Sequence, residues 1–118
     1  MRRDAQTYLW DIHNAADAIL RFVTGLDSLS YAGTEIVHAA VERKFEIIGE
    51  AMGQLAKLDP VLARRIPDMR DNIAFRNILI HGYAVVEHDQ VWRIAQTSLP
   101  SLRAVVAALL DELGPPAA

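Results

Sequence analysis

Cysteine is absent from the 118-residue chain. This excludes a disulfide-stapled fold and a thiolate metal site, and it suits a reducing compartment. Long apolar runs are absent too: the segment that follows the first four residues is amphipathic, which does not fit a signal peptide or a membrane-spanning helix. From these absences we expect a cytoplasmic protein that does not enter a membrane.

An excess of positive charge is also lacking. The chain has 12 lysines and arginines against 15 aspartates and glutamates, for a net charge of -3. This balance argues against a general nucleic-acid coat protein, although it allows a local basic patch. Basic residues gather in one stretch, at Lys57, Arg64, Arg65, Arg70 and Arg76. Two interpretations stay open, because Asp59, Asp68 and Asp71 lie among them: an ordinary solvated surface, or an electrostatic guide toward a polyanion.

The alternation of apolar and polar residues that marks a strand is missing as well. The apolar residues instead recur at helical spacing, and the length suits one domain over residues 1–118. We expect an all-α fold, an antiparallel four-helix bundle with its main helices over residues 4–24, 35–57, 68–81 and 89–113. A chain of this size has one core with little surplus stability, so oligomerisation is an open expectation.

Boundary residues support these helices. Thr34 is expected to cap the second helix, and Gly82 to end the third in the left-handed conformation. Pro100 is expected to kink the fourth helix or to divide it after Leu99. We interpret residues 25–33 and 83–87 as connections, and the segment between Asp59 and Pro67 as a connection that can hold a short helical turn.

Two glycines, Gly49 and Gly53, lie four residues apart on one face of the second helix. Each weakens a helix by about 1 kcal/mol relative to alanine. Such a pair is tolerable if another helix packs closely against it. A glycine-rich dinucleotide loop is rejected, because no strand precedes these residues.

The most informative stretch runs from residue 76 to residue 83. It places Arg76, Asn77, His81 and Tyr83 in and beside an otherwise apolar helix, where unpartnered polar groups are costly to bury. At about 100° per residue, Asn77 and His81 share one stripe and Arg76 lies on another. Asn77 is well placed to hydrogen-bond the ring of His81. Apolar groups surround the helix nearly all round, which predicts burial on several sides and a homodimer with this helix near the two-fold axis.

This set of side chains suits RNA cleavage without a metal. Histidine can move a proton to or from the 2′-hydroxyl or the leaving oxygen, and arginine can stabilise the charge on the phosphate. A two-fold axis would bring two copies of Arg76 and His81 to one phosphate. Structural roles stay open beside this one: Arg76 could pair with Glu46 or Glu50, and His81 could cap the helix or hydrogen-bond within the core.

The order of Arg76, four residues, His81, one residue and Tyr83 resembles the motif of the HEPN superfamily. More narrowly, the chain resembles the HepT-like ribonuclease toxins of nucleotidyltransferase/HepT toxin–antitoxin pairs. The similarity extends to residues 40–51, 66–67, 91–92 and 99–102, and thus covers most of the sequence.

The resemblance implies an all-helical dimer whose ribonuclease site lies in a cleft between protomers. It implies that Arg76 and His81 are catalytic and that Asn77 supports them. It also implies that Tyr83 is the tyrosine that a cognate nucleotidyltransferase antitoxin modifies with AMP to silence the toxin. The expected substrate is RNA, either tRNA or mRNA, and no cofactor is expected.

Two other classes compete with this interpretation. A di-iron bundle needs two Glu-x-x-His motifs, and we find one, at Glu35 and His38. His13, His38 and His88 lie on different predicted elements without ligand spacing, so we expect no metal site. The second class is a non-catalytic HEPN module that binds nucleotide or RNA and assembles with a nucleotidyltransferase.

Overall fold

A computed structural model of the protein describes residues 3–114. Over this range the chain forms seven α-helices and one 3-10 helix, and no strand. The helices are α1 (Ala5–Phe22), α2 (Ser28–Gly33), α3 (Glu35–Leu58), α4 (Pro60–Ala63), α5 (Met69–His81), η1 (Tyr83–Val85), α6 (His88–Gln96) and α7 (Ser98–Leu113). The prediction of an all-α protein is therefore confirmed. Among the described helices, none combines the length and hydropathy of a membrane span.

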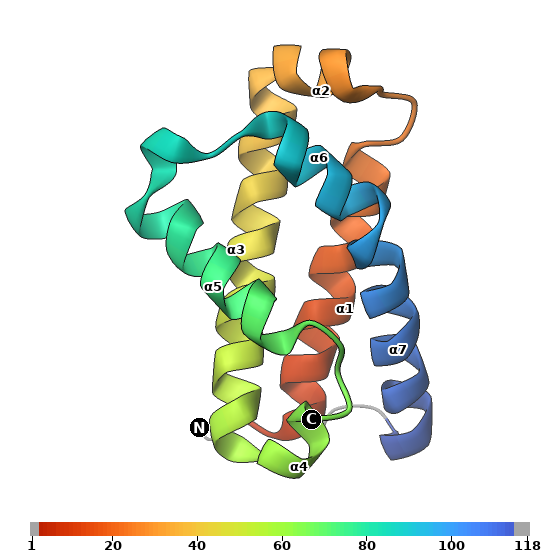
Figure 1. Ribbon diagram of the computed structural model, residues 1–118. Helices are drawn as coiled ribbons and strands as arrows, with labels where there is room; N and C mark the ends of the chain where they lie inside the picture. The colour runs from red at the N-terminus through yellow and green to blue at the C-terminus, as the bar shows by residue number, and fades with distance from the viewer. Residues whose placement is uncertain (1–2, 115–118) are drawn as a thin grey trace.

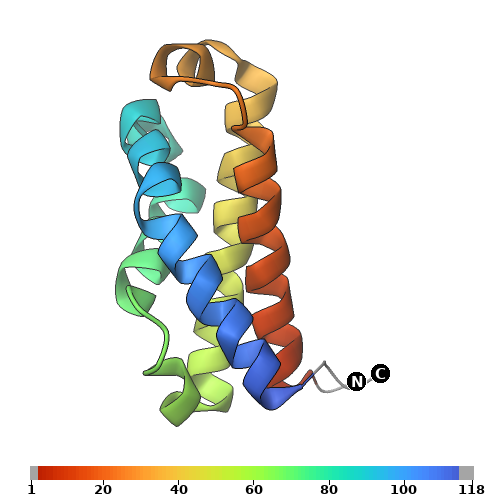
Figure 2. The ribbon, with the colours of Figure 1, turned by 90° about the vertical axis from the view of Figure 1, so that its right-hand side faces the viewer.

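The long helices α1 and α3 form the centre of the fold. They run antiparallel and side by side, and α5, α6 and α7 form a second layer across them (Figures 1 and 2). Helix α7 packs on α1, whereas α5 packs on α3. The core takes one apolar stripe from each long helix and single residues from the shorter ones. The largest fully buried side chains of the described residues are Leu9, Ile12, Ile19, Tyr31, Val41, Phe45, Ile48, Met52, Leu55, Val91, Leu99 and Val106.

A short helix lies where we expected only a connection. Helix α2 begins with a capping box, in which the Asp27 side chain accepts from the Ser30 amide and the Ser30 hydroxyl accepts from the Asp27 amide. The hydrogen bonds from Ser30 hold the pKa of the Asp27 carboxyl below its ordinary value. Tyr31, fully buried, anchors α2 against the rest of the protein. The capping box and the buried Tyr31 thus stabilise α2, which is too short to show a periodic pattern of apolar residues.

Thr34 precedes the first residue of α3, at the cap position that we predicted, but its hydroxyl does not cap that helix. The Thr34 hydroxyl donates to the Ser30 carbonyl at 2.7 Å instead, because Thr34 also follows the last residue of α2. The short turn predicted after Asp59 is α4, whose first residue is Pro60 and whose Leu62 amide donates to Asp59 Oδ1.

Gly82 follows the last residue of α5, as expected, although the left-handed conformation we gave as its reason is wrong. Its φ is -120°, and its amide donates to the Ile78 carbonyl at 2.8 Å. A Cβ at this position would lie 3.3 Å from the same carbonyl oxygen. The glycine therefore relieves crowding at the end of α5.

Pro100 divides the last predicted helix, but the break falls earlier than Leu99. Helix α6 ends at Gln96 and α7 begins at Ser98, so that Pro100 lies in the first turn of α7. In an unbroken helix Pro100 would face the Gln96 carbonyl without an amide hydrogen to offer it. First-turn amides need no helical partner, so the break before the proline removes that conflict. The predicted stop at Gly114 is observed, and the two prolines that follow it lie outside the described residues.

Candidate active site

Helices α3 and α5 approach each other closely at Gly49. A Cβ placed on Gly49 would lie 2.3 Å from Arg76 Cβ and 3.0 Å from the Asn72 carbonyl oxygen. The expectation that a helix packs closely on this glycine is confirmed. It does not hold for Gly53, because no atom of another helix among residues 3–114 lies within 4 Å of the corresponding Cβ position. The missing side chain at Gly49 therefore lets the backbone of α5 at Arg76 lie close to α3.

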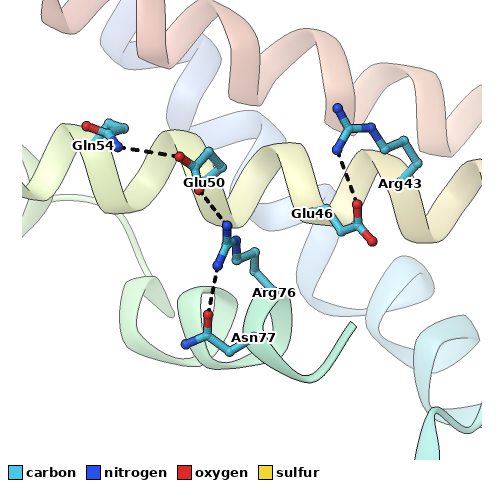
Figure 3. A network of polar contacts seen from close by, with 6 residues as sticks. All are labelled: Arg43, Glu46, Glu50, Gln54, Arg76 and Asn77. Carbon is cyan, nitrogen blue, oxygen red and sulfur yellow. Dashed lines mark hydrogen bonds and ion pairs between the residues drawn. The ribbon is translucent and has the colours of Figure 1, made fainter. Parts of the chain in front are cut away.

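Arg76 reaches across from α5 to α3. One guanidinium nitrogen, Nη2, lies 3.0 Å from Glu50 Oε2, and the other, Nη1, donates to Asn77 Oδ1 at 3.1 Å (Figure 3). Arg76 Nε is buried without a hydrogen-bond partner in the described residues. Of the two acids that sequence reasoning offered for Arg76, Glu50 is its partner, whereas Glu46 pairs with Arg43.

A groove of about 470 Å³ opens in front of this arginine, between α1, α3 and α5. Three arginines in its lining are matched by three carboxylates, in the ion pairs Arg3–Asp11, Arg43–Glu46 and Arg76–Glu50. Apolar and neutral groups complete the lining: Tyr8, Ile47, Ala51, Gln54 and Ile80. The groove can therefore receive a phosphate only in competition with its own acids. Sequence reasoning missed the contribution of α1, because these residues are far from the motif in sequence.

His81 and Tyr83 lie beyond this groove, at the end of α5 and in η1. Both side chains are exposed, and Tyr83 is 76% exposed. Within the described chain, His81 makes no hydrogen bond or ion pair, and Asn77 contacts Arg76 rather than the His81 ring. The structure thus brings Arg76 and Asn77 together, and it leaves His81 apart from them in the single chain.

In the single chain, most apolar side chains in and beside α5 are only partly buried or exposed. Leu79 is the one buried residue of α5, and Phe75 packs edge-on against Phe45 of α3. The side of α5 away from α3 carries exposed Ile78, and η1 carries exposed Val85. In the single chain α3 packs on one side of α5, and burial of the remaining sides by a partner subunit stays a prediction.

The basic stretch before α5 divides into two groups. Arg65 is held by Glu112 of α7 through two hydrogen bonds of 3.0 and 2.6 Å. Arg64 and Arg70 are exposed instead, and they line a second groove of about 550 Å³ with apolar neighbours. Arg65 therefore pairs with α7, whereas for Arg64 and Arg70 both interpretations of this stretch stay open.

A second group of titratable residues lies elsewhere, between α2, α3 and α6. The imidazole rings of His38 and His88 stack with their centroids 4.0 Å apart, and His38 Nδ1 lies 3.4 Å from Glu42 Oε2. Burial, with a smaller effect of the Glu42 carboxylate, raises the pKa of the neighbouring Tyr31 hydroxyl above its ordinary value. Our view that the histidines do not converge is wrong for His38 and His88. The four-residue spacing of His38 and Glu42 was the available signal.

Comparisons with known proteins agree with the family that the sequence resembles. The family model described as Ribonuclease HepT-like matches residues 12–109. A protein of Thermococcus cleftensis named "Probable ribonuclease HepT" is 31% identical over 103 residues, which cover 87% of this chain and 93% of that protein. A protein of Methanocaldococcus jannaschii named "Putative RNase" is 27% identical over 104 residues, which cover 86% of this chain and 93% of that one. No solved structure gives a significant match. Because the family model spans most of its length, the chain belongs to the HepT-like ribonuclease family.

Proposed function

We propose that the protein is a metal-independent endoribonuclease that acts as the toxin of a toxin–antitoxin pair in the cytoplasm. Membership of the HepT-like ribonuclease family supports RNA, either tRNA or mRNA, as its substrate. The observation that carries the site assignment is the position of Arg76, whose guanidinium lines a groove in front of α3 and α5. A planar guanidinium in such a place can hold a phosphate through two parallel hydrogen bonds.

In the proposed reaction, the RNA supplies its own nucleophile. A histidine, His81, accepts the proton of a ribose 2′-hydroxyl, and the oxygen attacks the adjacent phosphorus. The bond from phosphorus to the 5′-oxygen breaks, and that oxygen receives a proton from a second acid, the His81 of the other protomer. Arg76 stabilises the charge on the non-bridging oxygens, and Asn77 holds Arg76 in place. The products are a 2′,3′-cyclic phosphate and a 5′-hydroxyl end.

A homodimer supplies what one chain lacks in this scheme. Arg76 and His81 do not contact each other in a single protomer, so a two-fold axis beside α5 would unite their copies in a composite cleft. Exposed Ile78 and Val85 near this motif support such an interface. We take the protomer to be an antiparallel four-helix bundle made of α1, α3, α5 and the broken helix α6–α7.

We further propose that AMP attached to Tyr83 by a cognate nucleotidyltransferase silences the enzyme. The tyrosine oxygen would attack the α-phosphorus of ATP and release pyrophosphate, with loss of the phenolic proton. Tyr83 is 76% exposed, which gives a modifying enzyme access to it. A bulky anion two residues beyond His81 would repel the RNA phosphate from the cleft.

The decisive experiment is RNA cleavage by the purified protein in excess chelator. Arg76→Ala and His81→Ala should each lose roughly 10²-fold or more of the wild-type rate, since each group acts in the transition state. Arg21→Ala, which removes an exposed arginine of α1 outside the groove, serves as the control and should cleave normally. Equal cleavage by all variants would show a contaminating nuclease and would contradict the proposal.

The modification has its own test. The cognate nucleotidyltransferase and ATP should add one AMP to the wild-type protein and to Tyr8→Phe, as measured by intact-protein mass spectrometry. Tyr83→Phe should stay unmodified and should remain active in the presence of the transferase. Addition of AMP to Tyr83→Phe would place the modification at another residue.

One observation favours a second function. The ion pair between Arg76 and Glu50 is the structural role that an arginine at this place could have instead. In that case the protein would be a non-catalytic HEPN module that binds nucleotide or RNA and assembles with a nucleotidyltransferase. Saturable RNA binding by wild-type protein, with no cleavage above that of His81→Ala, would favour this alternative.

A further inference from the structure

Three potential metal ligands converge away from the Arg76 groove. One ligand atom each of His38, Glu42 and His88 lies within 4.8 Å of the other two. His38 and Glu42 are four residues apart and so project from one face of α3, whereas His88 is the first residue of α6. Zinc–nitrogen and zinc–oxygen distances of about 2.0–2.1 Å in a tetrahedral site place ligand atoms roughly 3.4 Å apart. The His38–Glu42 separation of 3.4 Å already has that value.

Three polar atoms of this cluster are buried without a hydrogen bond to any of the described residues: His38 Nδ1, His88 Nδ1 and the Tyr31 hydroxyl oxygen. His38 Nδ1 has the Glu42 carboxylate nearby at 3.4 Å, whereas no ion pair is formed by the other two atoms within residues 3–114. Tyr31 is fully buried, and its ring stands edge-on to both imidazoles at 6.3 Å between centroids. Each unsatisfied buried polar group costs about 1–3 kcal/mol. A cluster with several of them therefore points to a ligand that the protein chain itself does not supply.

The arrangement suits a metal cation. Neutral imidazole is the commonest protein ligand of transition metals, and the two rings, with centroids 4.0 Å apart, bring two such ligands together beside a carboxylate. The ligand set of two imidazoles and one carboxylate suits zinc, and the chain has no thiolate that would select a softer ion. Three protein ligands leave a fourth position for water, beside the Tyr31 ring.

We propose that His38, Glu42 and His88 form a binding site for one divalent transition-metal ion, with Zn²⁺ as its best fit. The ion ties α3 to the start of α6, and thereby fixes one end of the segment between His81 and His88 that carries Tyr83. None of the three ligands lines the groove at Arg76, so the metal has a structural role and takes no part in RNA cleavage.

The test uses the untagged full-length protein, stripped with chelator and transferred to metal-free buffer. Isothermal titration with ZnCl₂ should give one equivalent per chain, and the melting temperature should rise with free Zn²⁺ because the ion binds the folded state. Co²⁺ in place of Zn²⁺ should give visible absorption bands of a low-coordinate nitrogen and oxygen site. His38→Gln and His88→Gln should each weaken binding by roughly tenfold or more.

Two further variants keep the result unambiguous. His13→Gln is the matched control, since His13 also has a buried Nδ1 without a partner but stacks on Trp10 outside the cluster. It should bind Zn²⁺ as the wild type does. Glu42→Gln keeps the shape of the side chain and should fold, as checked by circular dichroism, while it loses affinity. Absence of stoichiometric binding, or undiminished binding by folded Glu42→Gln and His88→Gln, would overturn the proposal.

Discussion

Arg76 is held in the single chain by interactions that a phosphate can replace. Its side chain is 28% exposed and that of Glu50 is 55% exposed, so water screens much of their attraction. Exposed ion pairs of this kind contribute about 0.2–1 kcal/mol. In the proposed reaction, the phosphate of an RNA would therefore displace only a weak partner, while Asn77 would keep its hydrogen bond to the other guanidinium nitrogen.

Removal of the competing carboxylate should consequently strengthen RNA binding. Glu50→Gln should tighten the Kd for a non-cleavable 2′-O-methyl oligonucleotide by about 1.5- to 5-fold, as measured by fluorescence anisotropy. Glu46→Gln removes the same charge from the same groove but releases Arg43 instead, so it is the matched control. An equal gain from both variants would mean that net charge, rather than the freedom of Arg76, limits binding.

At the scale of elements, the close packing of α3 against α5 depends on the absence of a side chain at Gly49. Gly49 and Gly53 have the same helical context and the same intrinsic cost. Only the surroundings distinguish them, since the backbone of α5 crosses at Gly49 and leaves open space at Gly53. This crossing bears on the proposed site because Arg76 Cβ is the atom that a side chain at position 49 would meet first.

Alanine at the two positions should therefore act in opposite directions. Gly53→Ala should stabilise the protein by about 0.5–1 kcal/mol, since the helix gains propensity without a clash. Gly49→Ala gains the same propensity but overpacks against Arg76 and Asn72, so it should be less stable than Gly53→Ala by about 1–3 kcal/mol. Urea denaturation measures both values. Equal stability of the two variants would contradict the close crossing.

The ion pair between Arg65 and Glu112 joins the segment after α4 to α7 and carries a pH dependence. Hydrogen bonding to Arg65 lowers the pKa of the Glu112 carboxyl below its ordinary value, so the folded state favours the charged form. The stabilisation is present at pH 7 and is lost as the pH falls from about 4.3 through the lowered pKa.

We therefore expect Glu112→Gln to be less stable than wild type at pH 7. The gap in urea midpoint between the two proteins should close at acidic pH, once Glu112 of the wild type is protonated. A gap that stays constant from pH 7 to pH 3 would show that Glu112 stabilises α7 in some way other than by its charge.

At the scale of the whole molecule, the layers leave the outer side of α5 uncovered. Helix α3 packs on one side of α5, and exposed Ile78 and Val85 lie beside the proposed catalytic motif rather than in the core. Exposed apolar groups next to polar functional residues are typical of an interface. The proposed dimer would cover them and would complete the cleft at the same time.

An acidic residue in this surface should separate the protomers. Ile78→Asp should move the protein from dimer to monomer in sedimentation equilibrium, and it should reduce RNA cleavage in parallel. The protomer itself should stay folded, because Ile78 is already 45% exposed. Ile36→Asp is the control, since Ile36 on α3 is 80% exposed and lies away from the motif. Dimers of Ile78→Asp as stable as those of Ile36→Asp would place the interface elsewhere.

Local patterns in the sequence were enough to predict the long helices and to single out the motif between Arg76 and Tyr83. Apolar spacing gives α1, α3 and α5 within one or two residues, because a periodic stripe reports burial over many turns. Helix α2 escaped this reasoning, since its capping box and Tyr31 leave no periodic signal. The run from Arg76 to Tyr83 is visible because ionisable groups are unusual in an apolar helix.

The sequence by itself determined an all-helical chain with a HepT-like motif, because both depend on residues close together along the chain. The tertiary structure decided which residues of different helices contact each other. It chose Glu50 over Glu46 for Arg76, gave a close neighbour to Gly49 and none to Gly53, and stacked His38 on His88. These pairings depend on how helices cross in space, and the spacing of residues within one helix does not specify which side chains of another helix it will meet.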